Sequence, residues 1–473
     1  MFKFEKLESN IITIQEMAIQ GDTESQYELG FCYKEGIGLP QNYEEAVKWL
    51  EKAAGSGHAK AQANLSHCLF YGFGVPEDKE RAIQWAFKAA EQGIANAQAR
   101  LGDCYFHGNG IEKDYNKAVE WLNKAVAQDH SIAMNLLGVC YKNGFGVVQS
   151  YEKAVKLFRK AAEKGNKNAL YNLAMCLHKG QGVEKDEKES VLYFMKAAEL
   201  GQADSQNNIG VCYLEGRGVE QNYEKAVEWF TKAAKQNYPA ALCNLGYCYE
   251  RGQGIGQDLK KAVELYRKAA EYELPIALTN LARCYELGLG IEQDYKKAVG
   301  YYAAAADKND SEAQVCLGWC FQNGFGVHQD YKRAVELYSI ASNKGNVRAQ
   351  INLGYCYELG LGVEPDMGKA IDLYSRSAKG CNTKAMNNLG ACFLNGEGVE
   401  KNEKKAYEWF SKAAELGDVM GQWNVAYCYE HGIGIEQDYD NAIFWLARAA
   451  EQGDSDAEKA IKKILEKQRR QKN

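Results

Sequence analysis

Hydrophobic and polar positions recur along this chain with a period of 36 residues. In the first copy, Leu29, Cys32 and Tyr33 follow the i, i+3, i+4 spacing that places side chains on one face of a helix. The pattern predicts a first helix over residues 23–35. Gly36 should end it, because glycine tolerates the left-handed conformation common at helix ends.

A second amphipathic stretch follows in every copy. In the first copy, Ala46, Val47 and Leu50 form its apolar face, and Gly57 follows its end. Asn, Asp and Ser are favoured N-caps, because their side-chain oxygens accept from free backbone N–H groups. The residues at the predicted start of the second helix are all of these types: Asn42, Asp78, Asp114, Ser150, Asp186, Asn222, Asp258, Asp294, Asp330, Asp366, Asn402 and Asp438.

The repeat is regular from the Gly-x-Gly at 36/38 to the Gly-x-Gly at 432/434, giving twelve copies without insertion or deletion. A fixed period of 20–50 residues is the signature of a solenoid, in which each unit buries its apolar face against its neighbours. We therefore predict an all-α fold, a right-handed superhelical α/α solenoid. Residues 1–21 are expected to form an N-terminal capping helix, 22–453 twelve helical hairpins, and 454–473 a C-terminal capping helix with a basic tail.

The two ends have their own apolar faces. Residues Ile11, Ile14, Met17 and Ala18 should face the first hairpin. At the other end the expected face consists of Ala457, Ala460, Ile461, Ile464 and Leu465. Residues 458–473 carry seven Lys/Arg against two Glu. We interpret this run as a solvated helix, with a nucleic-acid or membrane arm as the alternative.

Four recurrent positions predict how the hairpins pack. Gly30 and Ala46, small in almost every copy, should face each other and let the two helices approach closely. Six tryptophans at one second-helix position are expected in the core: Trp49, Trp85, Trp121, Trp229, Trp409 and Trp445. Twelve cysteines, from Cys32 to Cys428, share one first-helix position. Equivalent positions on stacked helices lie about 10 Å apart, too far for a disulfide, so buried thiols are expected.

Composition agrees with a folded protein outside the membrane. Hydrophobic residues make up 46% and aromatic residues 11% of the chain, which supplies a core. A net charge of −6 gives no reason to expect nucleic acid. The charged start is unlike a secretory signal, and no apolar run reaches 18 residues, so no membrane insertion is expected. Fifteen cysteines suit a reducing compartment, and we predict a cytoplasmic location.

The repeat resembles the Sel1-like repeat, a relative of the tetratricopeptide repeat, over about residues 22–453. The resemblance is carried in one copy by Ala277, Asn280, Leu281, Cys284, Tyr285, Gly288, Gly290, Ile291, Asp294, Lys297, Ala298, Val299 and Tyr302. It implies an adaptor or scaffold whose first helices line a concave binding face. Membrane adaptors of endoplasmic-reticulum degradation in this family carry a signal and an anchor, and secreted members pair cysteines within each repeat. This chain shows neither pattern.

Residues that vary while the core repeats are the candidates for binding. The position of Phe31 holds Tyr247, Arg283, Trp319, Tyr355 and Tyr427 in the later repeats, and Trp423 occupies the variable position of Tyr27. Exposed Trp, Tyr and Arg are typical of interface hot spots. We predict that these six residues bind a partner, and wedging between adjacent helices is the alternative.

An asparagine row is the second candidate: Asn64, Asn172, Asn208, Asn244, Asn280, Asn352, Asn388 and Asn424. An amide can both donate to and accept from a peptide backbone. The family resemblance implies peptide contact at a related position, and we assign it to the six from Asn208 onward. The alternative is that each Asn bonds a neighbouring repeat and fixes the stacking angle.

No pattern predicts catalysis, a cofactor or a metal site. The Gly-x-Gly motifs follow helices, whereas a dinucleotide fingerprint follows a strand. Seven histidines are scattered, and Cys316 with Cys320 lacks two further ligands. We therefore predict a monomeric, non-enzymatic adaptor for a protein or peptide partner. The alternatives are a hydrolase activity, as proposed for secreted cysteine-rich relatives, and a self-assembling structural solenoid.

Overall fold

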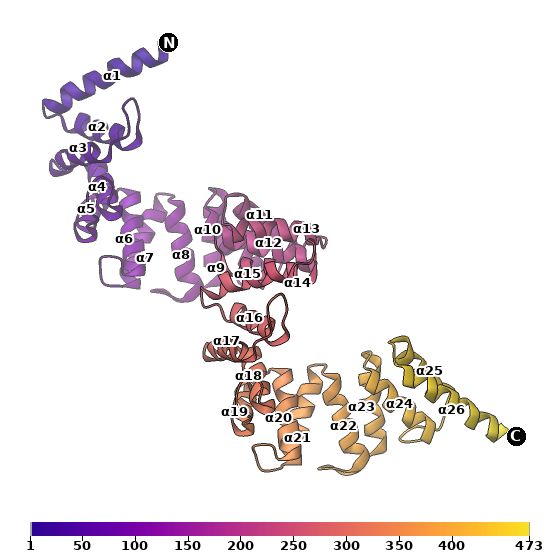
Figure 1. Cartoon of the computed structure of the whole chain (residues 1–473). Helices are drawn as coiled ribbons and strands as arrows, with labels where there is room; N and C mark the ends of the chain where they lie inside the picture. The colour runs from indigo at the N-terminus through magenta and orange to yellow at the C-terminus, as the bar shows by residue number, and fades with distance from the viewer. Residues whose placement is uncertain (1, 473) are drawn as a thin grey trace. The chain divides into compact units, whose positions relative to one another are not determined.

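The computed structural model describes residues 2–472, and side chains over residues 11–469. The described residues form α-helices in paired hairpins and no β-strand. By their contacts they divide into two compact units, Met1–Tyr238 and Pro239–Asn473. Figure 1 follows the helices of each unit in chain order.

The N-terminal unit holds one single helix and six hairpins. Its helices are α1 (Phe2–Ile19), α2 (Thr23–Glu35), α3 (Tyr43–Gly55), α4 (Ala59–Tyr71), α5 (Lys79–Glu91), α6 (Ala95–His107), α7 (Tyr115–Ala127), α8 (Ser131–Asn143), α9 (Tyr151–Glu163), α10 (Lys167–Lys179), α11 (Glu187–Glu199), α12 (Ala203–Glu215) and α13 (Tyr223–Ala234).

The C-terminal unit holds six hairpins and a last single helix. Its helices are α14 (Pro239–Arg251), α15 (Leu259–Ala270), α16 (Pro275–Leu287), α17 (Tyr295–Asp307), α18 (Ser311–Asn323), α19 (Tyr331–Asn343), α20 (Val347–Leu359), α21 (Met367–Lys379), α22 (Thr383–Asn395), α23 (Glu403–Glu415), α24 (Val419–His431), α25 (Tyr439–Glu451) and α26 (Ser455–Lys472).

Local chemistry sets the helix ends where the sequence predicts them. Asp22 caps α2 by accepting from the backbone N–H of Ser25, and Gly36 ends the helix at φ 73°. Asn42 caps α3 by accepting from the N–H groups of Glu44 and Glu45. The other eleven predicted caps, through Asp438, occupy the same place in their hairpins.

The small residue of the first helix faces both the Ala46 position and a large residue one turn later. Where Ser190 occupies the Ala46 position, its hydroxyl donates to the carbonyl of Ala174, at the Gly30 position, at 2.8 Å. A methyl group added at Gly30 would lie 2.9 Å from Cγ of Leu50. In a later repeat, the same addition at Gly318 would lie 2.7 Å from Cε1 of Tyr338, which is fully buried. The small residue therefore faces the bulky core side chain one turn beyond Ala46.

The tryptophan row is half-buried, and five of its six rings pack against core clusters without being enclosed by them. A cation one helical turn later lies over each ring. Nζ of Lys52 is 3.9 Å from the centroid of Trp49, and Nζ of Lys232 is 3.7 Å from that of Trp229. The other four rings are covered in the same way. The negative face of the aromatic ring attracts the cation above it, and this contact stabilises a tryptophan that is only half-buried.

The row of cysteines lies in the core, where Cys32 is half-buried and the other eleven are buried. Their carbonyls close the first helices, as Gly36 N–H donates to the carbonyl of Cys32 at 2.8 Å. Outside this row, Cys381 is exposed, in the turn between α21 and α22.

The terminal helices bury less than expected. In α1, Ile11 and Ala18 are buried, but Met17 is exposed. In α26, Ala457 and Ile464 are buried and Leu465 is exposed. A single helix has a neighbour on one side only, so residues at the edges of its apolar stripe stay in solvent. None of the helices in the described part of the chain is long and apolar enough to span a membrane.

Candidate partner-binding face

First helices of neighbouring hairpins lie side by side within each unit. In the N-terminal unit, Nδ2 of Asn172 on α10 donates to Oδ1 of Asn135 on α8 at 2.9 Å. In the C-terminal unit, Nη2 of Arg283 on α16 donates to Oε2 of Glu250 on α14 at 2.7 Å. Equivalent side chains on successive first helices therefore form rows. We call the surface they form the first-helix face.

Three predicted aromatic residues are exposed on this face in the C-terminal unit. Trp319 on α18 is 36% exposed, Tyr355 on α20 is 43% exposed, and Tyr427 on α24 is 50% exposed. The Trp319 ring lies 4.8 Å from that of Phe325, and the Tyr427 ring lies 4.2 Å from that of His431. These contacts restrict the rings while leaving area free, as expected of anchoring residues.

Sequence reasoning missed aliphatic residues beside these rings. Leu359, one turn after Tyr355, is 51% exposed, and Met420, one turn before Trp423, is 62% exposed. Leu359 occupies the position of Glu35, which varies between repeats. The sequence did offer one signal for Leu359, because the same position holds a charged residue in the first repeat.

Two predicted residues contact other side chains of the same chain. The Tyr247 ring lies 5.6 Å from the guanidinium of Arg251. Arg283 donates to both carboxylate oxygens of Glu250, at 2.9 and 2.7 Å, and Glu250 is only 7% exposed. The hydroxyl of Tyr266 donates to the same carboxylate at 3.0 Å. Releasing Arg283 to a partner would leave a buried carboxylate without its cation, which is costly.

Trp423, Asn424 and Tyr427 come together around a hollow of about 460 Å³ between α24 and the start of α26. Met420 and Asp454 also line it. Nε1 of Trp423 donates to Oδ2 of Asp454 at 2.7 Å. Trp423 therefore joins neighbouring elements and also lines the surface depression.

Five of the six selected asparagines, Asn244 among them, interact with other residues of the chain. Asn424 donates to Oδ1 of Asn387 at 3.3 Å. Three others bond tyrosine hydroxyls of neighbouring helices, in the pairs Asn208–Tyr171, Asn352–Tyr338 and Asn388–Tyr374. Asn244 and Asn280 are half-buried on α14 and α16. The named hydrogen bonds support the stacking role for the four asparagines that make them, and peptide contact remains a prediction for the row.

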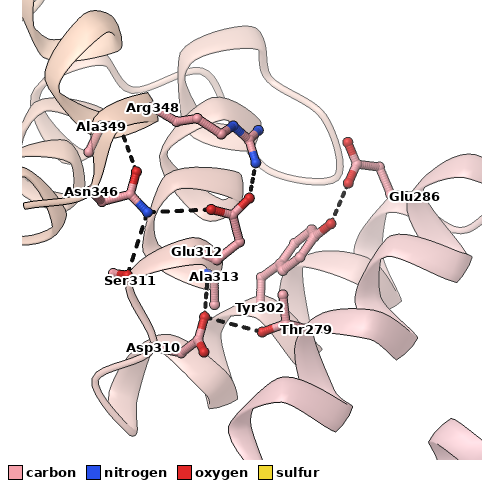
Figure 2. A network of polar contacts seen from close by, with 10 residues as sticks. All are labelled: Thr279, Glu286, Tyr302, Asp310, Ser311, Glu312, Ala313, Asn346, Arg348 and Ala349. Atoms are coloured by element: carbon pink, nitrogen blue, oxygen red, sulfur yellow. Dashed lines mark hydrogen bonds and ion pairs between the residues drawn. The ribbon is translucent and has the colours of Figure 1, made fainter. Parts of the chain in front are cut away.

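Figure 2 shows how polar side chains join successive repeats. Asp310 caps α18 and accepts from Thr279 Oγ1 of the preceding repeat at 3.4 Å. Arg348 forms an ion pair with Glu312, one repeat earlier. Both occupy the variable position of Glu24. Variation at this position therefore reflects stacking between repeats as well as exposed surface.

The described residues provide few groups that could bind a metal or act in catalysis. They contain no group of three or more His, Cys, Asp or Glu that could hold a metal. Burial raises the pKa of Cys104 to about 11 and that of Cys140 to about 12, so both thiols stay protonated and weakly nucleophilic at neutral pH. His178 is oriented by Glu187 at 2.8 Å, but its other nitrogen accepts from Arg217 at 3.3 Å instead of facing a nucleophile.

Comparison with known families identifies the repeat. The profile of the Sel1 repeat matches twelve segments of the chain: 23–58, 59–94, 95–130, 131–166, 167–202, 203–238, 239–271, 275–310, 311–346, 347–380, 383–418 and 419–454. No curated protein sequence matches the chain.

A solved structure agrees with the repeat assignment. The chain is 33% identical to a protective antigen present in uropathogenic Escherichia coli strains that displays an SLR fold. That match covers 89% of this chain and 90% of the other, with a TM-score of 0.67. A Sel1 repeat protein from Oxalobacter formigenes is 28% identical, covers 65% of this chain and 89% of its own, and has a TM-score of 0.48.

Proposed function

Because the chain belongs to the Sel1 repeat family, whose solenoids typically mediate protein–protein interaction, we propose that it is a non-enzymatic adaptor. It binds a protein or peptide segment on the first-helix face of residues 239–473. The exposed row Trp319, Tyr355 and Tyr427 supports this assignment. Leu359 and Met420 extend the same apolar surface.

The proposed mechanism uses rigid helices to present anchors. Trp and Tyr rings carry large contact areas at a small cost in conformational entropy, and aliphatic neighbours exclude water around them. The hollow beside Trp423 and Tyr427 would accept one side chain of the partner. A cytoplasmic location suits the row of buried thiols.

The test is the double substitution Trp319→Ala with Tyr355→Ala in the full chain. Truncating two hot-spot aromatics costs about 2 kcal/mol or more each, and about 4 kcal/mol corresponds to roughly thousandfold weaker binding, so partner capture should be abolished. A pull-down from native cell extract with quantitative mass spectrometry measures capture, and circular dichroism checks helicity.

The matched control removes exposed aromatics away from the first helices. Tyr272 and Phe444 are 53% and 52% exposed, and Tyr272→Ala with Phe444→Ala should leave capture unchanged. If both doubles capture the same proteins equally well, or if the first double loses helicity, the placement on this face is wrong.

A further inference from the structure

A second hollow, of about 500 Å³, lies on the first-helix face of the N-terminal unit. Its lining comes from four successive first helices: Lys34 on α2, His67 on α4, Arg100 on α6 and Ile132 on α8. Because four helices contribute, the depression extends along the row of repeats. It lies in the other unit from the aromatic row, so the inference below does not depend on the proposed site.

Arg100 is held in place by neutral groups. Its Nη2 donates to Nδ1 of His67 at 2.9 Å. Its guanidinium lies over the rings of Phe70 and Tyr71, 5.0 and 5.2 Å from their centroids. Within the described side chains, no carboxylate oxygen lies within 4.0 Å of this guanidinium.

The contrast with Arg283 shows what Arg100 lacks. Both arginines reach across to the preceding first helix, and Arg283 meets the buried Glu250 there. Arg100 meets His67 instead. Burial, followed by the charges of Arg100 and Lys34, lowers the pKa of His67 to about 4, so this ring is neutral near pH 7. A half-buried cation with no anionic partner is a binding opportunity, because its desolvation is not compensated within the chain.

The other cation of the lining is paired, because Lys34 forms an ion pair with Glu35 at 2.7 Å. The carboxylate of Asp103 lines the same hollow and lies 3.5 Å from His107. Arg100 is therefore the one cation of the described lining that has no carboxylate within 4.0 Å. The buried Ser66 hydroxyl also lines the hollow and has no hydrogen-bond partner among the described residues.

We propose that this hollow binds the carboxylate of a Glu or Asp side chain from an extended partner segment, with Arg100 as the ligand. A guanidinium binds a carboxylate through two parallel hydrogen bonds. One unpaired cation, with the Asp103 carboxylate in the same lining, matches a monoanion better than a doubly charged phosphate. Exposed Tyr71 and Ile132 supply apolar flanks for the residues on either side of the acid. Because the hollow extends along four helices, it can hold the interior of an extended chain and does not require a chain end.

The test titrates the full chain with three fluorescein-labelled pentapeptides. The first is Gly-Leu-Glu-Leu-Gly with an amidated C-terminus, the second replaces Glu by Gln, and the third is the Gln peptide with a free C-terminal carboxylate. Fluorescence anisotropy gives the affinities. The NMR signals of histidines labelled at Cε1, assigned with His67→Gln, locate the binding.

The Glu peptide should bind about tenfold or more tightly than either Gln peptide and shift the His67 signal. In Arg100→Gln this preference should vanish. Arg81→Gln is the matched control, because Arg81 is exposed on the second helix α5 and pairs with Glu51 at 3.2 Å. It should leave the preference intact. If Arg100→Gln loses helicity, Arg100→Lys replaces it, and the loss of bidentate geometry should still weaken the Glu peptide about tenfold.

Three results would overturn the proposal. The first is equal binding of the Glu and amidated Gln peptides. The second is tighter binding of the free-terminus peptide, which would make a chain end the ligand. The third is displacement of the Glu peptide by inorganic phosphate at lower concentration than by acetate, which would assign the hollow to phosphate groups. Loss of partner capture in the Trp319→Ala/Tyr355→Ala double mutant tests only the proposed site in the C-terminal unit. It says nothing about this hollow.

Discussion

The two glycines of each Gly-x-Gly motif meet different physical demands. Gly324 and Gly326 have φ of 74° and 73°, a left-handed region in which L side chains are strained. A methyl group added at Gly324 would have its nearest contact 3.5 Å away, at Cβ of Gln329. At Gly326 it would lie 2.4 Å from the backbone oxygen of Tyr295 in the preceding repeat. The second glycine therefore allows backbone of adjacent repeats to touch.

This difference predicts unequal costs of substitution. Gly326→Ala should lower the free energy of unfolding by about 3 kcal/mol or more, because a left-handed alanine also collides with backbone. Gly324→Asn should cost about 1 kcal/mol or less, because Asn tolerates this conformation. Urea denaturation followed by circular dichroism measures both. Equal midpoints for the two variants would show that backbone contact between repeats does not require the second glycine.

Neighbouring first helices are joined by side chains whose partners lie one repeat away. Arg283 on α16, Glu250 on α14 and Tyr266 on α15 form one such connection across two hairpins. In a later hairpin, Tyr338 donates to Gln322 at 2.9 Å in the equivalent place. A neutral acceptor is therefore sufficient for the tyrosine, whereas the carboxylate of Glu250 also binds Arg283.

The match predicts a non-additive double mutant. Arg283→Ala should destabilise by about 2 to 4 kcal/mol, because it leaves a buried carboxylate without its cation. Adding Glu250→Gln should recover part of that loss, since Gln still accepts from Tyr266 and carries no charge. Urea midpoints of the two single mutants and the double mutant give the coupling. Strictly additive losses would contradict a buried ion pair.

Helix ends were predictable from sequence because capping is local. Asn42 and its eleven equivalents need only the N–H groups two or three residues away. The roles of surface residues were harder to predict from the sequence. Whether Arg283 is free or paired depends on Glu250, 33 residues earlier. Trp49 looked like core because its period matched, but Lys52 allows it to remain half-buried. The hollow around Arg100 requires four helices at once, and no single repeat predicts it.

At the scale of the whole chain, stability comes from stacking of near neighbours. Within each unit, an interior hairpin packs against the one before and the one after, whereas α1 and α26 each pack against a single neighbour. Exposed Met17 and Leu465 show the same asymmetry at residue level. Repeat arrays behave as sums of unit stabilities and nearest-neighbour terms.

Hydrogen exchange should therefore vary systematically along the chain. Backbone amides in α8, α9, α18 and α19 should exchange about a hundredfold more slowly than those in α1 and α26, because opening an interior hairpin breaks two interfaces. Mass spectrometry of the exchanging full chain measures this profile. Uniform protection from end to end would indicate all-or-none unfolding instead.

The exposed thiol of Cys381 has a practical consequence. It stands in a surface turn while the row of cysteines is sequestered by the helices around it. A maleimide dye should therefore attach preferentially at this natural position, without engineering the chain. The resulting fluorophore would sit in the same unit as Trp319 and Tyr355, where it can report the arrival of a binding partner in real time.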